Sequence, residues 1–258
     1  MPRVQFPVYI PLGPLRLHPH AVFETLAYAI GFRIYLRLRR RQGDVIADGT
    51  RWSIVAAAIA GAAMGSKVLY WFEDPAATWQ HLTDPVFLLQ GKTIVGGLVG
   101  GLIAVEATKL AVGVREATGD LFAVPLALGA AIGRIGCFLT GLSDHTYGNP
   151  SALPWAVDFG DGVSRHPTQL YEALFLVVLA VALSQFARRP HVNGDVFKLF
   201  MTGYLGFRLI VDAVKPDPAF LGLSSIQWMA AAVLIYYAFV LWRRWHTAPA
   251  GIDLVSTA

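Results

Sequence analysis

The segment RWSIVAAAIAGAAMGSKVLYWF, residues 51–72, decides the fold class of this chain. It is almost entirely apolar or small between its ends, and its length matches the ~20 residues that a helix needs to cross a bilayer. Runs of similar length and character occupy Thr93–Gly113 and Ser225–Trp242. The alternation of apolar and polar residues that marks a transmembrane β-strand is absent. The sequence therefore predicts an all-α, polytopic membrane protein.

The composition supports this class. Of the 258 residues, 55% are hydrophobic and 15% are charged, and the mean hydropathy is +0.51, which is more apolar than a soluble domain of this size requires. Much of the net charge of +4 sits in an arginine cluster at residues 37–41, which membrane topology explains better than nucleic-acid binding. The single cysteine, Cys137, excludes an internal disulfide. The opening MPRVQFPVYIPLG has neither a long apolar core nor a clear cleavage site, so we expect no removed signal peptide.

The apolar runs and the turn-forming residues between them predict seven spanning helices in one domain, residues 1–258, with short loops and a small extracytoplasmic segment. We place the spans at roughly 19–37, 51–72, 93–113, 119–140, 167–187, 195–214 and 225–243. Arginines concentrate after the first, third, fifth and seventh of these spans. Because Lys and Arg are enriched in cytoplasmic loops, we expect the N-terminus outside and the C-terminus in the cytoplasm.

The ionisable side chains inside these spans include Glu24, Lys67, Arg134, Glu172, Arg208 and Asp212. The expected topology places all six at a similar depth, in the outer leaflet. A charge at bilayer depth is costly, so it usually marks a functional site. One interpretation is a set of ion pairs that fix helix register. The other is a polar cavity for a substrate with an anionic head and apolar tails, in which Arg134 and Arg208 bind a phosphate.

Two motifs hold two of these charges. They are GRIGCFLTG, residues 133–141, with Arg134, and RHPTQLYE, residues 165–172, with Glu172. The proline of the second motif suits the first position of a helix. We therefore expect His166, Gln169 and Glu172 to face the same layer, whereas Tyr171 is more typical of a packing or interfacial position.

Further polar residues follow Arg134. Cys137 lies three residues later on roughly the same face, either as a small apolar residue or as a nucleophilic thiol. Asp144 and His145 stand in the next loop, either as solvated side chains or as an acid–base pair. Their spacing along the chain matches no metal-ligand pattern, so we expect neither a metal nor another cofactor.

A second candidate anion site opens the third span, at GKTIVGG, residues 91–97. Lys92 and the backbone amides of Gly96 and Gly97 lie where a helix N-terminus attracts anions. The alternative is that small residues four apart, such as Gly96 and Gly100, let two helices pack closely. Of these two interpretations, helix packing is the more common.

These motifs, in order, resemble the bacterial prolipoprotein diacylglyceryl transferase family from the first span to Asp217. GRIGCFLTG is similar to that family's GRxGNFxN signature, and RHPTQLYE is similar to its HPxQLYE box. GYLGFRLIVD, residues 203–212, resembles its YxxFRxxxE segment and aligns Tyr204 with the tyrosine. GKTIVGGLVGG, residues 91–101, resembles SFHGGLxGG, and GSKVLY, residues 65–70, resembles GxRxxY.

The resemblance implies an enzyme of the bacterial inner (plasma) membrane. The family moves diacylglycerol from phosphatidylglycerol to the lipobox cysteine near the signal peptide of a prolipoprotein, and glycerol phosphate leaves. By position, Arg134 and Arg208 would hold the phosphate of this or another anionic phospholipid and stabilise charge on the leaving group. Glu172 and Gln169 would orient the head group or the arginines. The implied partners are thus a phospholipid and a signal peptide, and no nucleic acid.

The chain departs from the family where the acceptor thiol would be handled. The family histidine, often assigned to thiol activation, falls at Val95, which cannot take a proton. The two asparagines of the signature fall at Cys137 and Thr140, the glutamate that follows them falls at Leu142, and a first-span tyrosine falls at Glu24.

We therefore expect a divergent diacylglyceryl transferase with another general base, such as Glu24, Asp144 or His145. Two alternatives stay open at this point. One is a related transferase with a different acceptor, and the other is a non-enzymatic lipid-binding protein on the same scaffold.

Overall fold

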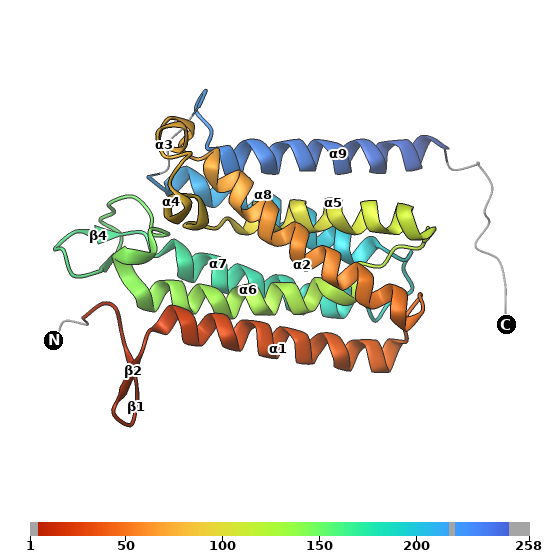
Figure 1. Ribbon diagram of the computed structural model, residues 1–258, viewed down its shortest axis with the longest axis horizontal. Coiled ribbons are helices and arrows are strands. Elements are labelled where there is room, and N and C mark those ends of the chain that lie inside the picture. Colours follow the sequence, from red (N-terminus) through yellow and green to blue (C-terminus); the bar gives the residue numbers. More distant parts are fainter. Residues whose placement is uncertain (1–4, 217–219, 248–258) are drawn as a thin grey trace.

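The computed structural model describes residues 5–216 and 220–247, which form one bundle of long helices (Figure 1). A long helix occupies each of the seven expected ranges: α1 (Pro19–Gln42), α2 (Asp48–Trp71), α5 (Ile94–Val112), α6 (Asp120–Thr140), α7 (Thr168–Phe186), α8 (Asp195–Val211) and α9 (Ser225–Thr247). The shorter elements are β1 (Ile10–Leu12), β2 (Leu15–Leu17), α3 (Pro75–Gln80), α4 (Pro85–Leu89), η1 (Gly141–Asp144), β3 (Val157–Asp158), β4 (Ser164–Arg165) and η2 (Asp212–Val214).

Four of the long helices are both long and apolar enough to cross a membrane. They are α2, α5, α6 together with η1 (Asp120–Asp144), and α7. Helix α9 contains a shorter apolar stretch, Ser225–Val240. The chain is thus a mostly helical membrane protein, and the count of seven spans stays a prediction.

Two parts of the fold differ from the expectation. Helix α1 continues through the arginines at 37–41 instead of ending at 37. Basic residues near a helix C-terminus interact favourably with the helix dipole, and Arg39 Nε also lies 2.7 Å from Asp44 Oδ2. The segment after α2, expected as a loop, contains α3 and α4. Each begins with an Asp-Pro pair in which Asp74 or Asp84 accepts hydrogen bonds from backbone amides of the first turn.

Close helix contact explains most of the glycine spacing. Helix α2 packs along α5, and a Cβ on Gly65 would lie 2.4 Å from the carbonyl oxygen of Gly96. A Cβ on Gly100 would lie 2.4 Å from the carbonyl oxygen of Gly61. Only hydrogen fits at such distances, so these glycines are packing residues. Helix α1 packs along α6, where a Cβ on Gly136 would lie 2.6 Å from the Cβ of Phe23. Helix α6 also packs along α7.

The short elements gather at one end of the bundle. In Figure 1 the β1–β2 hairpin, α3, α4 and β4 all lie at that end, where α6 ends and α7 begins, while the arginine-rich end of α1 lies at the other. Between the two ends α7 and α8 contribute to an apolar core that includes Leu176, Phe200 and Leu205, each fully buried. This core forms the floor below the polar residues described next.

Candidate active site

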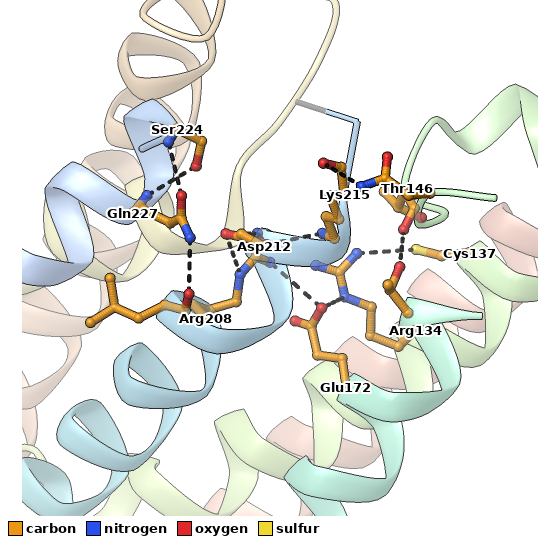
Figure 2. Close-up of polar contacts among 12 residues, drawn as sticks. Arg134, Cys137, Thr146, Glu172, Arg208, Asp212, Lys215, Ser224 and Gln227 are labelled. Atoms are coloured by element: carbon orange, nitrogen blue, oxygen red, sulfur yellow. Dashed lines mark hydrogen bonds and ion pairs between the residues drawn. The ribbon is translucent and has the colours of Figure 1, made fainter. Parts of the chain in front are cut away.

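Four of the six expected charges converge at the end of the bundle where the short elements gather (Figure 2). Arg134 comes from α6, Glu172 from α7, Arg208 from α8 and Asp212 from the first residue of η2. Arg134 Nε lies 2.8 Å from Glu172 Oε2, and Arg208 Nη1 lies 3.5 Å from the same oxygen. Arg208 Nη2 also lies 2.7 Å from Asp212 Oδ1. Glu172 therefore joins two arginines, one of which holds a second carboxylate.

Tyr204 and Lys215 complete this arginine–carboxylate cluster. The Tyr204 hydroxyl donates a hydrogen bond to Glu172 Oε1 at 2.6 Å, and Lys215 Nζ lies 3.4 Å from Asp212 Oδ1. Lys215 follows η2, outside the long helices, and burial together with the positive charge of Arg208 lowers the pKa of its ammonium group. The sequence alone did not single out Lys215 as a site residue. Its position three residues after Asp212 was the available signal.

The arginine–carboxylate cluster has a surplus of positive charge. It brings together three cations, Arg134, Arg208 and Lys215, but only two carboxylates. Every one of these side chains is at least 90% buried. Because buried charge is expensive unless it is paired, such a group is suited to one more anion.

Gln169 provides neutral donors next to this charge. It lies one turn before Glu172 on the same face of α7 and is 1% exposed. Within the described part of the chain, neither its amide nitrogen nor its amide oxygen has a hydrogen-bond partner. Buried polar groups are normally satisfied, so the unpaired amide points to a ligand that supplies acceptors.

A second polar group adjoins the first and contains a residue that sequence reasoning missed, His20. Its Nδ1 lies 2.9 Å from Asp144 Oδ1, and its Nε2 lies 3.6 Å from Glu24 Oε2. Lys92 Nζ lies 2.6 Å from the other oxygen of Glu24. Cys137 connects the two groups. Its sulfur lies 3.9 Å from Arg134 Nη1 (Figure 2) and within 4.8 Å of the nearest ligand atoms of His20 and Asp144. For the contact between His20 and Glu24, the only sequence signal was their i, i+4 spacing.

Other expected site residues lie elsewhere. Lys67 donates to the backbone carbonyl of Gly91 at 2.6 Å and to those of Leu89 and Gln90, so it fastens the end of α4 and pairs with none of the five other charges expected in its layer. The amide of Gly96, expected to be available for an anion, donates to the side chain of Thr93 at 3.2 Å. A Cβ on Gly97 would lie 3.5 Å from a carbonyl of α2, an ordinary packing distance.

The remaining candidates lie at the same end of the bundle, where His166 and Tyr171 are half-buried. His166 Nδ1 lies 3.2 Å from the Tyr171 hydroxyl, which accepts a hydrogen bond from Trp155 at 2.7 Å. His145 is exposed, and Asp144, its expected acid–base partner, contacts His20 instead. A cavity of about 310 Å³ at this end is lined by Thr140, Leu142 and neighbouring loop residues and by none of the six charges.

A family model and several known proteins match most of this chain. The model of the prolipoprotein diacylglyceryl transferase family matches residues 7–243. A phosphatidylglycerol–prolipoprotein diacylglyceryl transferase from Bordetella avium is 32% identical over 252 residues, which are 90% of this chain and 93% of that protein. A protein of the same name from Cupriavidus pinatubonensis is 32% identical over 95% of this chain and 94% of its own length. Another, from Methylococcus capsulatus, is 31% identical over 91% of this chain and 91% of its own length.

Proposed function

The chain belongs to the prolipoprotein diacylglyceryl transferase family, and we propose that it transfers diacylglycerol from phosphatidylglycerol to a cysteine thiol of a prolipoprotein. The observation that carries the donor half of this proposal is the positive surplus of the buried arginine–carboxylate cluster, together with the unpaired amide of Gln169. A phosphodiester supplies one negative charge and several acceptor oxygens. It is therefore the anion that both features call for.

The arginines also suit the chemical step. When the glyceryl carbon–oxygen bond breaks, the phosphate of glycerol phosphate takes up a second negative charge. Arg134 and Arg208 reach one carboxylate from two different helices, so they can hold one phosphate from two sides. Donors that are fixed before the reaction stabilise such developing charge without reorganising. Glu172 holds both guanidinium groups in place until the lipid arrives, and Tyr204 fixes the orientation of Glu172 through its hydrogen bond.

Charge asymmetry supports the membrane placement that we propose. The arginine-rich end of α1 lies at the opposite end of the bundle from the site (Figure 1). With that end in the cytoplasm, the site lies in the outer half of the bacterial inner membrane, open to outer-leaflet phospholipid. The N-terminus is then outside, the C-terminus is cytoplasmic, and all seven long helices of the single domain span the membrane.

The acceptor that we propose is the lipobox cysteine at a prolipoprotein signal peptide, as the names of the relatives indicate for those proteins. The position of the family histidine is occupied here by Val95, which is fully buried and has no ionisable group. Thiol activation must therefore use other residues.

The test is release of glycerol phosphate by the purified protein in phosphatidylglycerol-containing micelles, with and without a lipobox peptide. We expect peptide-dependent release that Arg208→Gln abolishes. The matched control is Arg115→Gln, which changes an exposed arginine and should retain the wild-type rate. Release that does not need the peptide would replace the proposed acceptor with water or another molecule. Lipid binding without release would replace the enzyme with a lipid-binding protein.

A further inference from the structure

We propose that His20, Cys137 and Asp144 form a site for a divalent zinc ion with one open coordination position. The three residues come from the first turn of α1, the last turn of α6 and the end of η1. Their ligand atoms, one imidazole nitrogen, one thiol sulfur and one carboxylate oxygen, all lie within 4.8 Å of one another. The spacing along the chain does not predict a metal site, because His20 stands more than a hundred residues before the other two.

The donor set fits zinc better than other common ions. Thiolate and imidazole ligands favour zinc over magnesium and calcium, which prefer oxygen. Catalytic zinc sites use three protein ligands and leave the fourth position to water or substrate. A thiolate and a carboxylate together neutralise the charge of the ion, which matters at a site where Cys137 is 9% exposed and the Asp144 side chain is 8% exposed.

The distances require only small movements. Zinc lies about 2.0–2.3 Å from such ligands, so tetrahedral ligand atoms stand about 3.5 Å apart. His20 Nδ1 and Asp144 Oδ1 are now 2.9 Å apart, a hydrogen-bond distance, and would separate slightly to admit the ion in place of the shared proton. The widest ligand gap would close by about 1 Å on the same scale. The helices that hold His20 and Cys137 pack along each other, which limits larger shifts.

The residues around the trio resemble the outer shell of a metal site. His20 directs Nδ1 toward the trio while its Nε2 lies 3.6 Å from Glu24. A carboxylate on the far nitrogen of a ligating histidine fixes the ring and increases its basicity. Glu24 is itself held by Lys92, and Thr146 donates a 2.5 Å hydrogen bond to the second oxygen of Asp144. Both acidic residues of the group are thus oriented by neighbours.

The open side defines what the site would bind. The His20 side chain is 33% exposed, whereas the other two ligands are buried, so the fourth position faces outward past the imidazole. Arg134 Nη1 lies 3.9 Å from the Cys137 sulfur, which places the proposed phosphate site directly beside the proposed ion. The fourth ligand with the matching chemistry is the thiol of the acceptor, and this role rests on the function proposed above.

The step balances without a redox change. The acceptor thiol binds zinc as a thiolate and its proton passes to water, since a coordinating thiol is deprotonated. The sulfur lone pair attacks the glyceryl carbon that carries the phosphate ester, a carbon–sulfur bond forms and the carbon–oxygen bond breaks. The electron pair of that bond leaves with glycerol phosphate. Cys137 is not the nucleophile in this scheme, because an alkyl thioether on Cys137 would have no labile bond to pass the group on.

The test separates binding from activity. Protein stripped with a chelator is re-equilibrated with zinc alone, and bound zinc per chain is measured for the wild type, Cys137→Ser and Asp144→Asn. We expect one zinc per chain and at least a tenfold loss of affinity in both variants. The matched control is His18→Asn, which changes a histidine two residues from His20 and should bind zinc normally. Equal binding by all four proteins, or none by the wild type, would overturn the site.

Cobalt gives a second readout that does not depend on turnover. Cobalt-loaded wild type should show a thiolate charge-transfer band that is lost in Cys137→Ser, and a lipobox peptide should strengthen that band. No band in the wild type would overturn the assignment. If chelator-stripped protein released glycerol phosphate at an unchanged rate, zinc would have no role in the transfer, while the proposed transferase activity would stand. A zinc-binding protein that releases no glycerol phosphate would refute the transferase while leaving the site intact.

Discussion

Glu172 joins Arg134 and Arg208, so removing its charge tests the arginine–carboxylate cluster most sharply. Glu172→Gln keeps the volume of the side chain and a group that can still meet Tyr204. It leaves Arg134 without a carboxylate and Arg208 with Asp212 alone. Removing one partner of a buried ion pair costs about 3–5 kcal/mol, because the other charge stays buried and unpaired. Glu172 is 1% exposed, so solvent does not reduce this cost.

The assay is thermal unfolding of purified protein in detergent, with and without phosphatidylglycerol. On the scale of ~2–4 °C per kcal/mol for chains near this size, the variant should unfold at least about 6 °C below the wild type without lipid. The phospholipid should recover a large part of that loss, since its phosphate replaces the missing carboxylate. Glu116→Gln, which changes an exposed glutamate, is the matched control and should unfold as the wild type does.

Two results would exclude this role of Glu172. A variant that unfolds within ~1 °C of the wild type would show that Glu172 does not neutralise buried arginines. A variant that is destabilised but gains no more from phosphatidylglycerol than from a neutral phospholipid would show that no phosphate enters the cluster.

Three further substitutions test Arg134, Gln169 and the contact between α2 and α5. Arg134→Lys keeps the charge but loses the planar pair of donors. We therefore expect the rate of glycerol phosphate release to fall about 10²–10³-fold, the usual loss for one such donor. A fall of less than threefold would show that Arg134 does not take part in the chemical step. Gln169→Leu replaces the unpaired amide by an apolar group. Without lipid, the variant should unfold at or above the wild-type temperature, while KM for phosphatidylglycerol should rise. A lower unfolding temperature would mean that the amide already has a partner. Gly65→Leu forces α2 away from Gly96 of α5, so folded yield in detergent should drop sharply, whereas Gly133→Leu, at a glycine with open space around it, should retain it.

The long helices follow from the sequence because each apolar run has a length that only a helix can use inside a bilayer. The end of α1 was harder to place, because its arginines are polar but are also good helix formers at a favourable end of the dipole. Helices α3 and α4 were not predicted, because the Asp-Pro pairs at their starts were interpreted as turns. Such pairs mark a turn and a helix start equally well, and only the capping bonds of Asp74 and Asp84 distinguish the two.

The site was predictable in part. A shared depth is predictable for Arg134, Glu172, Arg208 and Asp212, because each lies a fixed number of turns from a helix end. The structure brings these four together. Lys67 was expected beside them at the same depth, because depth does not determine the direction in which a side chain points around the bundle axis. Lys67 instead faces the carbonyls at the end of α4.

His20 shows what a single sequence cannot supply. Its contact with Asp144 joins residues that are 124 positions apart in the chain and depends on how α1 lies along α6. A lone histidine at a helix start has many ordinary explanations, and only the three-dimensional arrangement sets it between two carboxylates and beside the thiol of Cys137.

The proposed reaction joins a phospholipid-derived group to a thiol. The most direct measurement is mass spectrometry of a lipobox peptide after incubation with the purified protein and phosphatidylglycerol of one defined acyl composition. The peptide should gain the mass of that diacylglyceryl group on its cysteine, and a peptide with serine in place of the cysteine should stay unmodified. An unmodified cysteine peptide, or equal modification of both peptides, would contradict the proposed reaction.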